Sequence, residues 1–151
     1  MGKGRGMTQY YDEFYMTDEK RPILDRYKEV NQLLRQAYWA KERDDQTMYR
    51  AIEQSQNFAV FETESDKLVG FARVVTDYAT VFYLCDVYVE EAFRGRGIGR
   101  KLVERIVVHE DKFAGINGLL KTRDAKKLYE KFGFAECKAV CMVLDRDCGK
   151  K

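Results

Sequence analysis

A single α/β domain with a mixed sheet is the fold class that the sequence predicts, on two observations. Between residues 10 and 145, strand-like apolar runs and amphipathic helical patterns follow one another in the order β-α-α-β-β-β-α-β-α-β. At 151 residues the chain can bury one ordinary core, and no internal repeat or linker interrupts it. We therefore expect a flexible leader over residues 1–9, one domain over 10–145 and a tail over 146–151.

The first half of the domain is expected to hold a strand, two helices and a hairpin. Apolar residues three and four positions apart, such as Tyr27, Val30 and Leu34, indicate an amphipathic helix, and Pro22 favours a helix start. In order, the expected elements are a strand over 10–16, a helix from Pro22 through Tyr38, a helix with Asp44 or Asp45 as its N-cap, and a hairpin of strands 57–63 and 68–76.

The second half centres on residues 81–89, a long run of Val, Tyr, Phe and Leu that is typical of a central strand. Residues 98–107 place their apolar side chains on one face and indicate a helix. The remaining expected elements are a strand in 115–122, a helix that Asp124 caps and Gly133 ends, and one or two last strands over 135–144.

Composition excludes several classes of protein. Apolar residues make up 45% and charged residues 34% of the chain, as in ordinary globular domains, and a net charge of +2 is too small to indicate a nucleic-acid surface. No run approaches the roughly 20 apolar residues that span a membrane, and no signal peptide is visible. The four cysteines form no Cys-x-x-Cys pair and there is one histidine, so we expect no metal site and a reducing, cytoplasmic location.

Residues 94–99 read Arg-Gly-Arg-Gly-Ile-Gly, between the expected central strand and the helix that follows. Three glycines at alternate positions let backbone N–H groups converge beside the positive end of that helix, an arrangement that binds phosphate or pyrophosphate. The spacing fits neither the dinucleotide fingerprint nor a P-loop, since no Gly-Lys-Ser/Thr occurs and the third glycine is missing in either register. We expect a phosphorylated ligand of another kind.

The spacing Arg94-x-x-Gly97-x-Gly99 resembles the pyrophosphate-binding loop of the GNAT superfamily of acyl-CoA-dependent N-acyltransferases. A second motif, Tyr-x-x-x-Gly-Phe at residues 129–134, is similar to one that these proteins often carry. The order of elements over 10–145 agrees as well. Short stretches at 37–41, 76–78 and 122–125 are similar to an uncharacterised bacterial subgroup of the superfamily.

The resemblance implies a mixed, mostly antiparallel sheet of six to seven strands, flanked by about four helices, in which two central parallel strands splay apart. It also implies that acetyl-CoA is the co-substrate and fills the gap between those strands, with its pyrophosphate on the glycine turn. The arginines of the turn add positive charge, which favours a role in ligand binding, and they are also found at solvated helix starts. The cofactor-binding residues expected from the resemblance are Val87, Tyr88, Val89, Arg94, Gly95, Arg96, Gly97, Ile98, Gly99 and Arg100.

Two residues are catalytic candidates. Tyr129 is placed by the resemblance to donate a proton to the departing thiolate, and a phenol pKa of about 10 against about 8.5 for a thiol makes that transfer only slightly uphill. On position alone, Tyr129 is more typical of a half-buried core residue, and the glycine turn and the resemblance favour the catalytic role. Asp86 is the candidate base, because an acidic residue within a central strand requires a partner. It also fits a pairing with a nearby arginine or a backbone cap. Other candidates for the base are Tyr83, Cys85, Asp77 and a water relay.

We expect the acceptor to bind between the first two helices and the loop after Thr76. The candidate substrate-binding residues are Tyr38, Trp39, Asp77 and Tyr78, since an aromatic wall with acidic residues suits a cationic amine. Tyr38 and Trp39 are equally consistent with the packed end of a helix.

The predicted function is N-acetyl transfer from acetyl-CoA to a primary amine by direct attack, with a small amine favoured over a protein lysine or N-terminus. A non-catalytic acyl-CoA-binding regulator is the alternative. A nucleic-acid module that uses the Arg-Gly run is disfavoured by the low net charge. The expected partners are acetyl-CoA and an amine, with no nucleic acid and no membrane, in a monomer or a homodimer.

Overall fold

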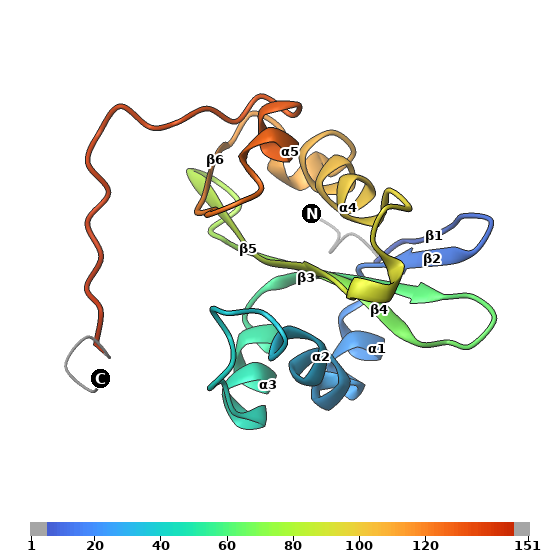
Figure 1. The fold of residues 1–151 in the computed structure, drawn as a ribbon. Coiled ribbons are helices and arrows are strands. Elements are labelled where there is room, and N and C mark those ends of the chain that lie inside the picture. Colours follow the sequence, from blue (N-terminus) through green and yellow to red (C-terminus); the bar gives the residue numbers. More distant parts are fainter. Residues whose placement is uncertain (1–5, 147–151) are drawn as a thin grey trace.

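The computed structural model describes residues 6–146, which form one six-stranded sheet with its strands in chain order (Figure 1). Neighbouring strands are antiparallel from β1 through β5, and β5 and β6 are parallel. The predicted mixed, mostly antiparallel sheet is therefore confirmed. The strands are β1 (Thr8–Tyr10), β2 (Phe14–Thr17), β3 (Gln56–Glu62), β4 (Leu68–Thr76), β5 (Val81–Val89) and β6 (Asn117–Leu120).

Helices cover both faces of the sheet. Figure 1 shows α1, α2 and α3 on one face and α4 and α5 on the other. Two short 3-10 turns, η1 (Glu91–Phe93) and η2 (Asp111–Phe113), flank α4 in the chain. The helices are α1 (Lys20–Asp25), α2 (Tyr27–Leu34), α3 (Asp45–Glu53), α4 (Ile98–Val107) and α5 (Lys126–Glu130).

An apolar core lies on each face of the sheet. The core on the α4 side includes Phe58, Leu102 and Ile106, and the core on the α1–α3 side includes Leu34 and Phe71; all five are fully buried. Each such side chain contributes about 1.5–3 kcal/mol by leaving water. The two cores fix the sheet between its helix layers, and they thereby hold β5 and β6 in place.

The N-terminal region differs from the prediction. Residues 10–16 form a hairpin rather than one strand, because the chain turns between β1 and β2 with Tyr11 N–H donating to Phe14 O at 2.7 Å. The flexible leader was predicted to extend through residue 9, but β1 already begins at Thr8. The predicted long helix is interrupted at Arg26, whose backbone (φ −108°, ψ 26°) leaves the helical region.

The long helix also ends earlier than predicted, at Leu34. The buried Ala37 and Ala40 therefore pack through a series of turns rather than through a continued helix. Asp44 is the N-cap of α3, as one of the two predicted candidates, and its side chain accepts from Thr47 N–H at 2.7 Å.

The end of α5 agrees with the prediction, but its start does not. Gly133 has φ 90°, and two hydrogen bonds close a Schellman motif: Phe134 N–H to Tyr129 O and Gly133 N–H to Glu130 O. Asp124 is not the N-cap as predicted. The N-cap is Ala125, whose N–H donates to Thr122 Oγ1 at 2.9 Å, because the threonine hydroxyl already takes the place that Asp124 was expected to fill.

The last predicted strands, over 135–144, are absent from the described residues. This segment leaves α5 as an extended trace (Figure 1), and Val140, Met142 and Leu144 are 86%, 90% and 74% exposed. An apolar run forms a strand only where the edge of a sheet pairs with it, and the sequence does not show where that edge lies. Of the predicted tail, residues 147–151 lie outside the described residues. Within 6–146, no helix is long and apolar enough to cross a membrane.

Candidate active site

A bulge in β5 turns Asp86 toward the α1–α3 face. Phe71 pairs with Tyr88 but Arg73 pairs with Cys85, so one extra residue of β5 is accommodated between these two pairs. Asp86 lies at this bulge. Its φ of 53° is in the left-handed region that non-glycine residues seldom adopt. Without the bulge, strict alternation would place Asp86 with Phe82 and Leu84 in the α4-side core.

The parallel strands β5 and β6 separate after a short paired stretch. Their register runs from Val81 opposite Asn117 to Leu84 opposite Leu120 and ends there. Over the rest of β5, residues 85–89, no described strand pairs on this side, so the splay that the resemblance implied is confirmed. Backbone N–H and C=O groups left without a ladder partner require another partner, and a bound ligand can provide one.

The first of two cavities, about 420 Å³, lies along this open part of β5. The glycine turn forms one end of it, where Gly95 and Gly97 adopt φ 82° and 80° and α4 begins at Ile98. Positive φ at both positions is the reason that glycine is needed there. The lining residues are Trp39, Val87, Tyr88, Val89, Phe93, Arg94, Gly95, Gly97, Ile98, Gly99, Asp124, Ala125, Leu128 and Tyr129.

The three arginines of the turn differ in their placement. Arg94 lines the first cavity, donates from Nε to Val89 O at 3.0 Å and lies over the ring of Tyr88. Arg96 instead points to Glu13, at 3.7 Å, and packs over the ring of Phe93. Arg100 is exposed on α4 and does not line the cavity.

A second cavity of about 440 Å³ adjoins the first. The two share Trp39, Val87, Asp124, Ala125 and Tyr129 as lining residues, so they meet at the face of α5 that carries Tyr129. The other residues that line the second cavity are Tyr38, Arg43, Arg73, Tyr83, Leu84, Cys85, Asp86, Lys121 and Thr122.

Tyr129 lies at the junction of the two cavities. The residue is 8% exposed, and its hydroxyl makes no hydrogen bond to any residue within 6–146. Burial, and then the negative charge of Asp124, raise the pKa of Tyr129 to about 12. The phenol is therefore fully protonated near pH 7 and holds a proton that it can donate.

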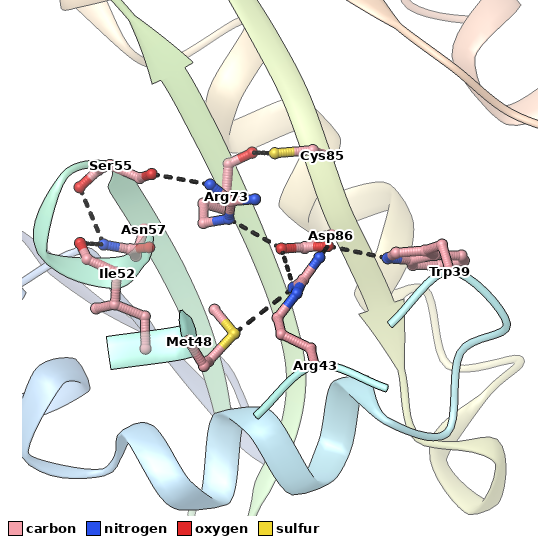
Figure 2. Close-up of polar contacts among 9 residues, drawn as sticks. All are labelled: Trp39, Arg43, Met48, Ile52, Ser55, Asn57, Arg73, Cys85 and Asp86. Carbon is pink, nitrogen blue, oxygen red and sulfur yellow. Dashed lines mark hydrogen bonds and ion pairs between the residues drawn. The ribbon is translucent and has the colours of Figure 1, made fainter. Parts of the chain in front are cut away.

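Asp86, which also lines the second cavity, is the centre of a buried charge network (Figure 2). Its Oδ1 accepts from Trp39 Nε1 at 2.9 Å and from Arg43 Nη2 at 3.2 Å. Its Oδ2 accepts from Arg43 Nη1 at 2.8 Å and from Arg73 Nε at 2.9 Å. Burial opposes ionisation of this carboxyl, but the Arg43 hydrogen bond and the charges of Arg73 and Arg43 outweigh it and lower the pKa of Asp86.

The thiol of Cys85 belongs to the same wall of the cavity. It donates to Arg73 O at 3.5 Å, and burial raises the pKa of Cys85 to about 11. Near pH 7 this cysteine is therefore protonated. It is unreactive, because the thiolate is the reactive form.

Only part of the predicted acceptor wall comes together. Tyr38 and Trp39 line the second cavity with Asp86 and Tyr129, whereas Asp77 and Tyr78 do not. The exposed Asp77 carboxylate accepts from the backbone N–H groups of Ala79 and Thr80 and from the Thr80 hydroxyl, and these hydrogen bonds lower its pKa. Asp77 thus closes its own loop.

Tyr78 also lies elsewhere. Its ring stacks on Phe113 at 6.0 Å, and its hydroxyl donates to Gln56 Oε1 at 3.2 Å. Sequence reasoning missed Arg43 and Arg73. An available signal was the charge of Arg73 within an apolar strand, next to the expected strand that carries Asp86.

Comparison with known proteins agrees with the fold. Residues 54–136 match the family model of the acetyltransferase (GNAT) domain. A GNAT-family protein from Xanthomonas campestris pv. campestris is 31% identical, with 85% of this chain and 89% of that chain covered and a TM-score of 0.75. Glucosamine-6-phosphate N-acetyltransferase from Arabidopsis thaliana shares the fold at 23% identity, with 90% and 100% covered and a TM-score of 0.68. A search of the curated proteins gave no match.

The fold and the site therefore define an acyltransferase. The chain belongs to the GNAT superfamily of acetyltransferases, whose co-substrate is acetyl-CoA.

Proposed function

We propose that the protein transfers the acetyl group of acetyl-CoA directly to a small primary amine, with both substrates bound together. The observation that carries this proposal is the meeting of two cavities at Tyr129, one along the open part of β5 and one beside it. A cavity of about 440 Å³ has the size of a small-molecule site. This favours a small acceptor over a lysine on a folded protein.

The first cavity is the proposed acetyl-CoA site. Acetyl-CoA supplies the thioester that is the source of the acetyl group. Backbone groups of Val87, Tyr88 and Val89 would hold the pantetheine arm, since residues 85–89 lack a strand partner toward β6. The amides of 95–99 and the start of α4 would hold the pyrophosphate. Among the arginine side chains, Arg94 is the one that lines this cavity, whereas Arg96 and Arg100 would act only through their charge.

Tyr129 is the proposed proton donor. In the transfer, a C–N bond forms to the amine, the C–S bond breaks, and the leaving sulfur takes the phenolic proton, which solvent later replaces. The pKa of Tyr129 is about 12, and that of a thiol in water is about 8.5. With these two values, the proton transfer is uphill by roughly 5 kcal/mol. The same burial also raises the pKa of a thiol, so the difference inside the site is smaller.

The open strand also supplies the proposed oxyanion contact. Backbone N–H groups near residues 87–89 would make this contact, because β6 does not pair with this part of β5. Such donors stabilise the negative charge that develops on a carbonyl oxygen.

Asp86 is proposed as a positioning residue rather than as the base. Both of its oxygens already accept two hydrogen bonds from positive or aromatic N–H donors, and its lowered pKa makes it a weak proton acceptor. We assign the removal of the amine proton to water in the second cavity, which is open to solvent. Asp86 would orient Arg43, Arg73 and Trp39 around the acceptor.

A thiol-release assay with a panel of small amines tests the proposal. We expect turnover with some amines, and a fall in kcat of about a hundredfold for Tyr129→Phe, the usual lower range for a general acid. The matched control is Tyr10→Phe, because Tyr10 is 77% exposed and far from both cavities in the sheet order. Binding of acetyl-CoA without turnover over a broad panel would instead favour a non-catalytic regulator.

A further inference from the structure

We infer that the acceptor amine carries an anionic group, a carboxylate or a phosphate, which Arg73 and Arg43 bind. The inference rests on the proposed function, since it takes the second cavity as the acceptor site. It concerns the part of that cavity lined by Arg43, Arg73 and Asp86.

The described residues that line the cavity leave this wall with a net positive charge. The side chains of Arg43 and Arg73 are only 18% and 15% exposed, and both pair with the same carboxylate, Asp86, which is 2% exposed. Two guanidinium groups and one carboxylate leave one positive charge in a mostly buried cluster. Among the other charged residues that line the cavity, Lys121 and Asp124 offset one another. A buried charge without a counterion is costly, and a bound anion would offset that cost.

Arg73 has donors left for such an anion. Its Nε donates to Asp86 and its Nη1 to Ser55 Oγ at 3.1 Å, but its Nη2 has no acceptor among the described residues. In Figure 2, this third nitrogen of Arg73 has no dashed line. Arg43 likewise directs both Nη groups to Asp86 and leaves its Nε without an acceptor within 6–146. Guanidinium groups fixed by other contacts are well suited to bind carboxylate or phosphate oxygens.

The wall also discriminates between classes of acceptor. A purely cationic acceptor gains nothing from this wall, because Asp86 is already paired and Asp77 lies outside the cavity. An acceptor that carries both an amine and an anionic group can place the amine near Tyr129 and the anion at Arg73 and Arg43.

Matched pairs of acceptors test the inference. The pairs are β-alanine against β-alaninamide, for a carboxylate, and 2-aminoethyl phosphate against ethanolamine, for a phosphate. We expect kcat/KM at least tenfold higher for the anionic member of one pair, and which pair shows it identifies the anion. In Arg73→Gln, KM for that member should rise at least tenfold while KM for its neutral partner stays within twofold. Arg73→Lys, which keeps the charge, should recover part of the loss.

The control is Arg21→Gln, because Arg21 is 81% exposed in a surface ion pair with Asp25. It should leave both members of each pair unchanged. Equal use of neutral and anionic amines by the wild-type protein, or an equal loss for both in Arg73→Gln, would overturn the inference. The proposed function would stand in that case, since amines would still be acetylated.

A binding measurement separates the two proposals fully. Trp39 is the one tryptophan of the chain and donates to Asp86, so its fluorescence reports on this wall. With coenzyme A present, 2-aminoethyl phosphate or β-alanine should change the emission saturably, the neutral partners should not, and Arg73→Lys should weaken the change. If neither anionic amine gives a saturable change, the inference is wrong, whether or not the protein acetylates amines. Saturable binding without acetylation of any amine would support the anion site and contradict the proposed function.

Discussion

Replacing Asp86 with asparagine tests the charge network that forms the acceptor wall. Asparagine keeps the shape of the side chain and tolerates φ 53°, so the bulge in β5 can persist. What changes is the set of acceptors. Whichever way the new amide is turned, its NH₂ group faces two N–H donors: Trp39 and Arg43 on the Oδ1 side, or Arg43 and Arg73 on the Oδ2 side.

The cost follows from these contacts. Two charge-assisted or buried hydrogen bonds are lost, at about 1.5–3 kcal/mol each. Two mostly buried guanidinium groups also lose their counterion, and breaking a buried pair typically costs about 3–5 kcal/mol. Since both figures describe the same lost contacts, they are not added, and we expect Asp86→Asn to lower the free energy of unfolding by about 3–5 kcal/mol.

Urea unfolding followed by circular dichroism measures this loss. The matched control is Asp66→Asn, because Asp66 also has positive φ (59°) and pairs with an arginine, Arg26, but its side chain is 65% exposed. An exposed pair is worth about 1 kcal/mol or less, so the control should change little. A loss below about 1 kcal/mol for Asp86→Asn would refute the reasoning, since it would mean that the two arginines do not depend on this carboxylate.

The same pair of proteins gives a pH dependence with a defined sign. The pKa of Asp86 in the folded protein lies below its ordinary value of about 3.9, so its stabilising contribution is present above about pH 4 and is lost as the pH falls through the lowered folded pKa. The difference in stability between the wild-type protein and Asp86→Asn should therefore shrink on acidification below about pH 4. A difference that grows on acidification would contradict the assignment.

Three further predictions follow from other parts of the fold. Because the pKa of Tyr129 is raised to about 12, kcat should show no fall from ionisation of this group below about pH 11, and an alkaline fall near pH 9 that disappears in Tyr129→Phe would contradict this. Gly97→Ala and Gly115→Ala both introduce a side chain at positive φ into open space, at about 1–2 kcal/mol each, but only Gly97→Ala should weaken coenzyme A binding by calorimetry. The double change Val140→Lys and Met142→Lys should lower the fluorescence of a dye that binds exposed apolar surface without lowering the melting temperature, because both side chains lie in solvent; a lower melting temperature would show that they are packed.

The predictions made from sequence succeeded where a local pattern decides the structure. The apolar runs of β4 and β5 and the helix after the glycine turn were placed with the bounds that the structure has, because each is long and ends at a turn. The hairpin of β1 and β2 was read as one strand, since its turn carries no glycine or proline. Residues 135–144 have a strand pattern but no described partner.

The site shows the same division. The glycine turn and Tyr129 belong to motifs, so their positions followed from sequence. Arg43 joins the cavity only through tertiary structure, from the loop between α2 and α3, and the direction of Asp86 depends on a bulge that alternation alone does not show. Asp77 was expected at the acceptor wall, but its carboxylate is used within its own loop.

The central claim is that acetyl transfer takes place where the two cavities meet, with Tyr129 as the proton donor. A crystal structure of the protein with coenzyme A tests it most directly. The account predicts the coenzyme A sulfur within about 3.5 Å of Tyr129 Oη, beside the open stretch of β5. A sulfur atom away from Tyr129, for example in the cavity of about 510 Å³ that Tyr10, Phe14 and Lys101 line, would contradict it.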